Sequence, residues 1–309
     1  MAGKRDLVSM VDVERDLMGL LELTGTLKNR AKAGETYAPL RGKSLAMIFE
    51  KASTRTRVSF EVAMTQLGGH AVNLTPADTQ LGRGETIADT AKVLSRYVHG
   101  IMYRAYRHAD MVDLARNATV PVINGLDDME HPCQIISDLF TILEARNRLK
   151  GMRIAYLGDG NNVCNSLLLG AAIVGAHIAA GCPKAFQPHP DMVREAERIA
   201  RQTGSDVRVV TDPTDAVKGA DVVYTDVWVS MGMEKERETR ERVFRPFQVN
   251  RALLAHATGN ALVMHCLPAH RGLEIAAEVI DGPQSIVFDQ AENRLHAQKA
   301  ILARFVGGL

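Results

Sequence analysis

The sequence predicts an α/β protein made of two doubly wound parallel-sheet domains that are joined by a long helix. Short apolar runs alternate along the chain with segments whose apolar residues recur at helical spacing. This alternation pauses at a long helical segment, 132–148, and restarts after Gly151. Polar side chains follow many of the apolar runs, where the carboxyl ends of parallel strands form a binding edge. We therefore expect a first domain at 1–147 and a second domain at 148–289.

Composition narrows the class of protein. The chain has 309 residues, of which 46% are apolar, enough for two domains with buried cores. With 37 basic and 36 acidic side chains the formal net charge is +1, so we expect no nucleic-acid partner. We expect no membrane association, because no apolar segment is long enough to span a bilayer and none follows Lys4 and Arg5 as in a signal peptide. Four cysteines with neither CxxC pairs nor zinc-site spacing indicate a reduced, cytoplasmic protein without a metal site.

The first half of the chain is expected to begin with an amphipathic helical region at 1–32 and to continue with four strand–helix pairs. Gly68 and Gly69 illustrate how the boundaries are set, because they end a helix whose apolar residues recur every three or four positions. The expected strands are Leu45–Phe49, His70–Leu74, Gly100–Tyr103 and Val120–Asn124. The expected helices are Arg55–Leu67, Thr86–Arg96, His108–Arg116 and Pro132–Arg148.

The second half repeats the pattern. The expected strands are Arg153–Leu157, His177–Ala180, Val207–Val210, Val222–Thr225, Leu262–His265 and Ile286–Phe288. The expected helices are Asn162–Gly175, Asp191–Thr203 and a closing helix, Ala291–Val306. The stretch 234–245 is very charged, so we expect a solvated, mobile loop there and not a binding surface.

A charged turn, Ser53–Arg57, lies where the first strand passes into its helix. Ser53 is a typical helix N-cap, and the N-terminus of a helix favours an anion because its backbone N–H groups point outward. Arg55 adds a planar guanidinium group, a fork of paired N–H donors that can bind two phosphate oxygens at once. Lys51 and Arg57 raise the positive potential around the turn. The turn therefore predicts a phosphate site without the glycines of a P-loop. Taken alone, the turn is more simply an ordinary capped helix with solvated arginines, but the motifs further along the chain favour the phosphate site.

Two further motifs follow predicted strands. His131-Pro132-Cys133-Gln134 opens the long helix, and its imidazole and amide are one turn apart, suited to a carbonyl oxygen and an amide N–H; alternatively the histidine is only a cap. Gly158–Asn162 resembles a dinucleotide fingerprint, but Val163 occupies the third glycine position and no acidic residue ends the next strand. A nicotinamide cofactor is therefore not expected, and Asn162 offers its amide to a zwitterionic ligand.

Two more polar residues lie at strand ends in the second half. Asp226 follows Val222–Thr225, and its carboxylate suits an ammonium group. Cys266 follows Leu262–His265 and is either a buried small side chain or an active-site thiol.

Together these motifs resemble those of the aspartate/ornithine transcarbamylase family, and more specifically its ornithine enzymes. Ser53–Arg57 and His131–Gln134 are similar to the family's carbamoyl phosphate motifs. Asp226–Gly232 and His265–Pro268 resemble motifs of the ornithine enzymes, from which the aspartate enzymes differ. The resemblance covers almost the whole chain. It implies two α/β domains with an active site in the cleft between them, and a C-terminal helix, 290–309, that returns to the first domain. It also implies a homotrimer that in some members stacks into larger assemblies, and no metal or organic cofactor.

The resemblance also implies a role for each matching residue. The phosphate of carbamoyl phosphate is expected to bind Ser53, Thr54, Arg55 and Thr56. Its carbamoyl end is expected to meet Arg104, His131, Gln134 and Arg294, with Pro132 and Cys133 in the same motif and Cys266 and Leu267 at the junction of the two substrates. Gln80 is expected to reach into a neighbouring subunit's site. L-Ornithine is expected to bind Asn162, Asp226, Ser230 and Met231.

The implied reaction transfers the carbamoyl group of carbamoyl phosphate to the δ-amine of L-ornithine, giving L-citrulline and phosphate. Arg104, His131, Asp226 and Cys266 are the expected catalytic residues, with no covalent intermediate. Three alternatives stay open at this point. The acceptor is another amine, such as putrescine, lysine or an acylated ornithine; the chain is an inactive ligand-binding or scaffold subunit; or it is a nucleotide-binding oxidoreductase.

Overall fold

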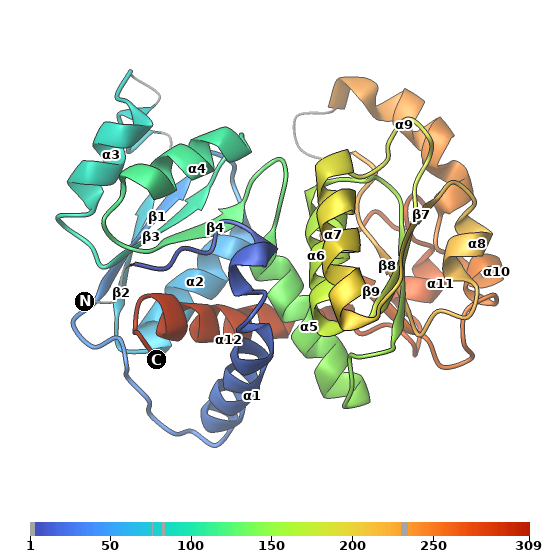
Figure 1. Ribbon diagram of the computed structural model, residues 1–309, viewed down its shortest axis with the longest axis horizontal. Helices are drawn as coiled ribbons and strands as arrows, with labels where there is room; N and C mark the ends of the chain where they lie inside the picture. Colours follow the sequence, from blue (N-terminus) through green and yellow to red (C-terminus); the bar gives the residue numbers. More distant parts are fainter. Residues whose placement is uncertain (1–3, 76, 82–83, 230–233) are drawn as a thin grey trace. The chain divides into compact units, whose positions relative to one another are not determined.

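The computed structural model describes residues 4–75, 77–81, 84–229 and 234–309 (Figure 1). The chain forms two compact units. Unit 1 comprises Met1–Phe140 and Asn293–Leu309, and unit 2 comprises Thr141–Glu292. The divisions fall inside two helices, α5 (Pro132–Arg146) and α12 (Val287–Phe305). The fold class expected from the sequence, two parallel-sheet α/β domains, is confirmed.

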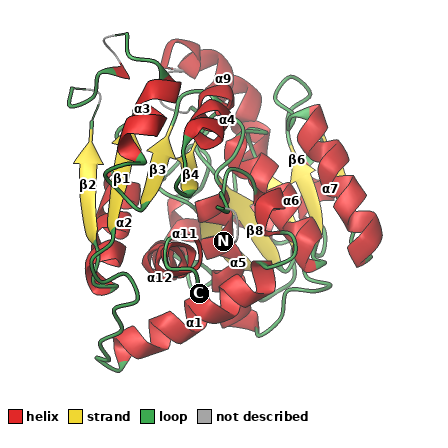
Figure 2. Ribbon diagram, turned by 60° about the vertical axis from the view of Figure 1, so that its left-hand side comes forward, coloured by secondary structure: helices red, strands yellow, loops and turns green. Residues whose placement is uncertain are grey.

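Unit 1 is built on a four-stranded parallel sheet in the order β2-β1-β3-β4, whose strands lie side by side in Figure 2. The strands are β1 (Ser44–Phe49), β2 (His70–Leu74), β3 (Gly100–Arg104) and β4 (Val122–Leu126). The helices are η1 (Met10–Val13), α1 (Leu17–Lys32), α2 (Thr54–Gln66), α3 (Ile87–Leu94) and α4 (His108–Asn117). Figure 1 shows α3 and α4 on one face of this sheet and α2 with α12 on the other. Because β1 and β3 are covered on both faces, their residues form continuous apolar runs.

Unit 2 is built on a five-stranded parallel sheet in the order β7-β6-β5-β8-β9. The strands are β5 (Arg153–Leu157), β6 (His177–Gly181), β7 (Val207–Val210), β8 (Val222–Thr225) and β9 (Leu262–His265). The helices are α6 (Asn162–Val174), α7 (Pro190–Thr203), α8 (Pro213–Val217), η3 (Glu234–Glu236), α9 (Arg237–Phe244), η4 (Arg245–Phe247), α10 (Arg251–Leu254) and α11 (Ala277–Ile280). The strand order reverses at β5 and β8, so the loops after these strands are where a ligand is expected.

Two expectations about elements were wrong. Ile286–Phe288 is not a strand: only Ser285 makes an isolated bridge, to Val263, and α12 begins at Val287. The stretch 234–245 is not a loop over its described length, because η3 and α9 occupy it. Within the described parts of the chain, no helix is both long and apolar enough to cross a membrane.

Candidate functional site

The charged turn of unit 1 connects β1 to α2. Ser53 is extended at φ −159° and its Oγ accepts the Thr56 backbone N–H at 3.2 Å, which makes it the N-cap of α2. Thr54 is exposed, and Arg55 is partly exposed in the first turn of the helix. The predicted anion-binding geometry is therefore present: a capped helix N-terminus that carries a guanidinium group.

Two more arginines are held beside this turn by one buried hydroxyl. Thr56 is fully buried, and its Oγ1 accepts hydrogen bonds from Arg294 Nη2 at 2.9 Å and Arg104 Nη1 at 3.4 Å. Arg104 ends β3 and Arg294 lies in α12, so residues about 50 and 240 positions apart in the sequence meet at the start of α2. These two arginines, Thr56 and the Ser53–Arg55 turn form what we call the cationic cluster.

The electrostatics of unit 1 reflect this concentration of positive charge. His131 is only 4% exposed, and burial, together with the charges of Arg294 and Arg104, lowers its pKa well below 6.5. Burial and the Arg104 charge likewise lower the pKa of Lys51, whose ammonium group lies over the Tyr106 ring, 4.8 Å from its centroid. His131 is therefore a neutral imidazole near neutral pH, and the cluster has an excess of positive charge that an anion would relieve.

The residues after His131 begin α5. Gln134 is buried, and its amide nitrogen donates to Asp138 Oδ1 at 2.8 Å, which fixes the direction of the amide. Cys133 is completely buried, its Sγ donates to the Asn124 carbonyl at 3.3 Å, and burial raises its pKa to about 12. The Cys133 side chain thus faces β4, so any contact of this residue with a ligand would come from its backbone.

Sequence reasoning missed the residue that shapes the loop before His131. Asp127 is fully buried, and its Oδ1 accepts the backbone N–H groups of Met129 at 2.8 Å and Glu130 at 2.7 Å. Its Oδ2 lies 2.7 Å from His108 Nδ1. An aspartate in a loop between two expected elements carries no signal of burial, so its role in presenting His131 became visible only in the structure.

Gln80 lies apart from these residues along the chain, in the turn between β2 and α3. Its side chain is exposed, and its carbonyl accepts the Glu85 N–H at 3.1 Å. The expected role of Gln80 concerns a neighbouring chain and stays a prediction.

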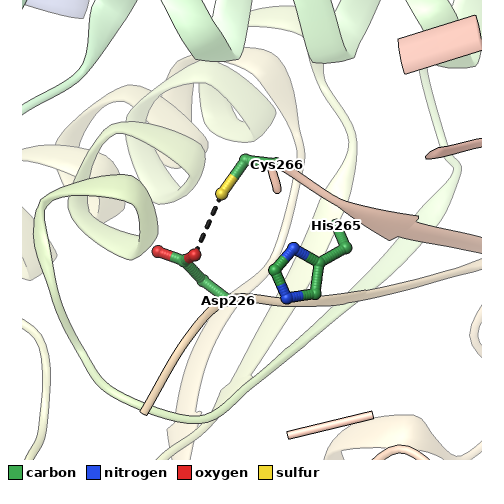
Figure 3. A group of neighbouring side chains, drawn as sticks. All are labelled: Asp226, His265 and Cys266. Carbon is green, nitrogen blue, oxygen red and sulfur yellow. Dashed lines mark hydrogen bonds between the residues drawn. The ribbon is translucent and has the colours of Figure 1, made fainter. Parts of the chain in front are cut away.

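Unit 2 has a second polar site, at the ends of β8 and β9 (Figure 3). Asp226 is 6% exposed, and its Oδ1 accepts the Cys266 thiol at 3.0 Å. The same oxygen accepts the Val227 N–H at 2.8 Å, and Oδ2 accepts Asn161 Nδ2 at 2.8 Å. Cys266 is partly exposed, whereas the other three free cysteines are buried. The two residues predicted from separate strand ends are thus hydrogen-bonded to one another.

Asn161, which sequence reasoning passed over, connects this site to α6. Its Oδ1 accepts the N–H groups of Val163 at 3.0 Å and Cys164 at 3.1 Å, so Asn161 caps α6. Asn162, the first residue of that helix, is partly exposed, and its Oδ1 also lies 3.0 Å from the Val163 nitrogen. An asparagine directly before an apolar helix is a typical N-cap, which is the signal that could have found Asn161. Ser230 and Met231 lie outside the described residues.

His265 lies beside Asp226 and Cys266 in Figure 3, and one ligand atom of each lies within 4.8 Å of the others, as a metal site would require. Both imidazole nitrogens, however, are engaged. Nδ1 accepts the Leu267 N–H at 2.9 Å, and Nε2 lies 3.2 Å from the buried Glu274 carboxylate. His265 thereby holds Leu267 at φ +59°, a left-handed conformation that is strained for leucine. The expectation that no metal takes part stays a prediction.

The polar sites of unit 1 and unit 2 suit two different kinds of ligand. Unit 1 offers a cationic cluster with a neutral imidazole, which suits an anion that carries a polar carbonyl. Unit 2 offers a buried carboxylate that already accepts three hydrogen bonds and has about one lone-pair position left, which suits an ammonium or amine.

In comparison with known proteins, both parts of the chain match models of one protein family. Residues 5–144 match the family description "Aspartate/ornithine carbamoyltransferase, carbamoyl-P binding domain", and residues 150–305 match "Aspartate/ornithine carbamoyltransferase, Asp/Orn binding domain". The chain is 54% identical to an ornithine carbamoyltransferase of Picrophilus torridus over 98% of its own length and 99% of the relative's. It is 53% identical to a Pyrococcus furiosus protein named "Ornithine carbamoyltransferase, anabolic", over 99% and 97% of the two lengths. A solved ornithine carbamoyltransferase structure from Pyrococcus furiosus is similar with a TM-score of 0.96 at 52% identity, covering 99% of this chain and 98% of that one.

Proposed function

The chain belongs to the aspartate/ornithine carbamoyltransferase family, and from this premise we propose that it is an ornithine carbamoyltransferase. The reaction transfers the carbamoyl group of carbamoyl phosphate to the δ-amine of L-ornithine and yields L-citrulline and phosphate. The observation that carries the proposal is the cationic cluster of unit 1 beside the neutral His131. The full-length similarity to proteins named ornithine carbamoyltransferase supports ornithine as the acceptor.

Carbamoyl phosphate binds in unit 1. Its phosphate lies at the N-terminus of α2, where Ser53, Thr54, Arg55 and Thr56 supply N–H, hydroxyl and guanidinium donors. Arg104 and Arg294 are already oriented by the Thr56 hydroxyl, so they are positioned before the ligand arrives. Neutral His131 and Arg104 donate to the carbamoyl oxygen, whose negative charge grows as the amine attacks.

Ornithine binds in unit 2. Its δ-amine has an ordinary pKa near that of lysine, about 10.4, and must lose a proton before it can attack. Asp226 orients this amine, while Asn162, Ser230 and Met231 bind the amino-acid end. The nitrogen then bonds to the carbonyl carbon, and the bond from that carbon to the phosphate oxygen breaks. Phosphate leaves with the electron pair and takes up the proton that the attacking nitrogen gives up. The Cys266 thiol is a hydrogen-bond donor to Asp226 and forms no covalent intermediate.

We propose a homotrimer in which Gln80 serves the site of the adjacent subunit. Gln80 is exposed, and β2 is an edge strand of its sheet. Val72 on this strand and Val58 on α2 are exposed apolar side chains, 38% and 52% accessible, which a partner chain would cover.

Subunit sharing can be tested by mixing two inactive variants, Gln80→Ala and Asp226→Ala. After unfolding and refolding a one-to-one mixture, a site is intact only where an Asp226-competent chain meets a Gln80-competent neighbour. In a cyclic trimer with random assembly that is about a quarter of the sites, so about a quarter of the wild-type activity returns. If verified mixed trimers stay inactive, Gln80 acts within its own chain.

We further propose a cytoplasmic enzyme that works in arginine biosynthesis. Four free cysteines support a reducing compartment, and the relative named anabolic supports the direction. The alternative is catabolic use of the reverse reaction.

The proposed activity has one rival that an assay separates directly, a carbamoyltransferase for another amine such as putrescine or lysine. Phosphate release from carbamoyl phosphate is measured with ornithine, putrescine, lysine and aspartate side by side, and citrulline is assayed independently. Ornithine should give the highest kcat/KM. A higher value with another amine would replace the proposal by that activity, and no release with any of the four would favour an inactive ligand-binding subunit.

A further inference from the structure

Arg240 is a buried arginine on an otherwise charged and solvated helix, α9. Its side chain is 4% exposed, whereas Arg237, Glu238 and Arg242 on the same helix are exposed. Its guanidinium carbon lies over two aromatic rings, 4.6 Å from the Phe186 centroid and 5.3 Å from that of Phe244. A buried charge of this kind is costly unless it is fully paired, so its partners show what it holds.

Two partners of Arg240 belong to the loops that follow neighbouring strands, and a third, Glu236 of η3, lies 3.4 Å from Arg240 Nη1. Its Nε donates to the Trp228 carbonyl at 2.6 Å, two residues beyond Asp226. Its Nη2 donates to Asp159, two residues beyond the end of β5. One planar fork thus joins the segment after β8 to the segment after β5.

Each of these two segments also carries a residue of the Asp226 site: the segment after β8 carries Asp226 itself, and the segment after β5 carries Asn161. Asn161, two residues from Asp159, donates to Asp226 Oδ2 and caps α6. Between them lies Gly160, where a Cβ atom would overlap the backbone of Gln187 and Pro188. This segment is therefore confined on both sides, so a shift of Asp159 is transmitted to Asn161 and from there to Asp226.

We propose that Arg240 is a positioning residue for the amino-acid substrate: by joining Asp159 to the Trp228 carbonyl it fixes the directions of Asp226 and of the N-terminus of α6. The inference rests on the proposed function, because it assigns the residue to the ornithine half of that reaction. Arg240 itself touches no reacting atom in this assignment.

The test compares Arg240→Gln and Arg240→Lys with Arg242→Gln, which removes an exposed charge two positions along the same helix. KM for ornithine is measured at saturating carbamoyl phosphate, and carbamoyl phosphate affinity is measured separately by calorimetry. Arg240→Gln should raise KM for ornithine about tenfold or more, the loss of a charge-assisted hydrogen bond, and leave carbamoyl phosphate affinity within about threefold. Arg240→Lys should show a smaller rise, because an ammonium keeps the charge but not the planar fork. Arg242→Gln should behave as wild type.

A second measurement does not depend on the carbamoyltransferase activity. Cys266 is the partly exposed cysteine, and its thiol donates to Asp226, so its alkylation by iodoacetamide, followed by peptide mapping, reports the position of that carboxylate. The thiolate is the reactive form and a nearby carboxylate opposes it, so displacement of Asp226 in Arg240→Gln should speed alkylation about threefold or more.

The outcomes separate the two claims. Wild-type KM and wild-type alkylation in Arg240→Gln overturn the positioning role, as does an equal loss of affinity for both substrates, which would mark a general structural role. If the wild-type protein does not use ornithine, the proposed function fails, while the alkylation rates still decide whether Arg240 positions Asp226. If Arg240→Gln does not fold, Arg240→Lys decides by the same two measurements.

Discussion

Replacing Thr56 by valine tests whether one buried hydroxyl preorganises the cationic cluster. Valine is nearly isosteric with threonine, so the change removes the oxygen that accepts from Arg294 and Arg104 and leaves the volume intact. Without that acceptor, each arginine loses a hydrogen bond that orients it, so both are less ordered before the ligand binds. Immobilising one long side chain costs about 0.5–1.5 kcal/mol, so two cost about 1–3 kcal/mol, which weakens binding about 5- to 150-fold.

Calorimetric titration of freshly dissolved carbamoyl phosphate measures this loss, with Thr56→Ser as the matched control because serine keeps the hydroxyl. Thr56→Ser should bind within about threefold of wild type, since its only loss is a methyl group. Thermal unfolding of all three proteins verifies that the variants are folded. If Thr56→Val binds like wild type, or if Thr56→Ser loses as much as Thr56→Val, the hydroxyl does not organise the two arginines.

Three further predictions concern titration and packing. His131 has a pKa well below 6.5, so its titration should not shape the dependence of the rate on pH between about pH 6 and 8. An inflection in that range that is present in wild type and absent in His131→Asn would show that the imidazole titrates there. Burial raises the pKa of Asp159 from 3.8 to about 6. The positive charge of Arg240 lowers this pKa, and the negative charges of Asp226 and Glu236 raise it further. The native state therefore binds this proton more tightly than the unfolded state, and wild type should lose about 3 kcal/mol of stability relative to Asp159→Asn as pH rises from 3.8 to about 6; parallel stability curves in denaturant would contradict this. Gly160→Ala should destabilise by about 1–3 kcal/mol or more because its Cβ meets backbone, whereas Gly259→Ala, with open space around it, should unfold like wild type; equal melting temperatures would refute the close approach.

Sequence reasoning placed the strands of unit 2 well. The bounds of β5, β7, β8 and β9 were predicted to the residue. The strands β5, β8 and β9 are almost entirely buried and form apolar runs, whereas β7 is an edge strand with an exposed arginine and is marked by its valines. The same rule failed at Ile286–Phe288, a run of three apolar residues in which the helix α12 begins at Val287. A run this short does not distinguish a strand from the first turn of a helix.

The helix α9 was missed because its buried residues do not form a recognisable apolar face. Only Arg240 and Phe244 are buried among its eight residues, and one of them is charged. The burial of Arg240 depends on Asp159 and on the Phe186 ring, which lie far away in the sequence. No local pattern encodes such partners, so the stretch was interpreted as a loop.

The candidate site was predictable where residues belong to motifs and not where they support them. Ser53 caps its helix as expected, and Asp226 and Cys266 meet at neighbouring strand ends as the topology requires. Asp127 and Asn161, which hold the loops that present these motifs, were not singled out. Their function follows from hydrogen bonds to backbone groups that only the folded chain brings within reach.

The central claim is that carbamoyl phosphate binds to the charged turn of unit 1 and ornithine binds to the Asp226 site of unit 2. Two-substrate steady-state kinetics of wild type, Arg55→Ala and Asp226→Asn test it most directly. Arg55→Ala should raise KM for carbamoyl phosphate by the equivalent of about 1.5–3 kcal/mol, roughly 10- to 150-fold, and leave KM for ornithine within about threefold. Asp226→Asn should raise KM for ornithine and leave KM for carbamoyl phosphate within about threefold. Equal effects of either variant on both substrates, or a wild-type KM for carbamoyl phosphate in Arg55→Ala, would contradict the assignment.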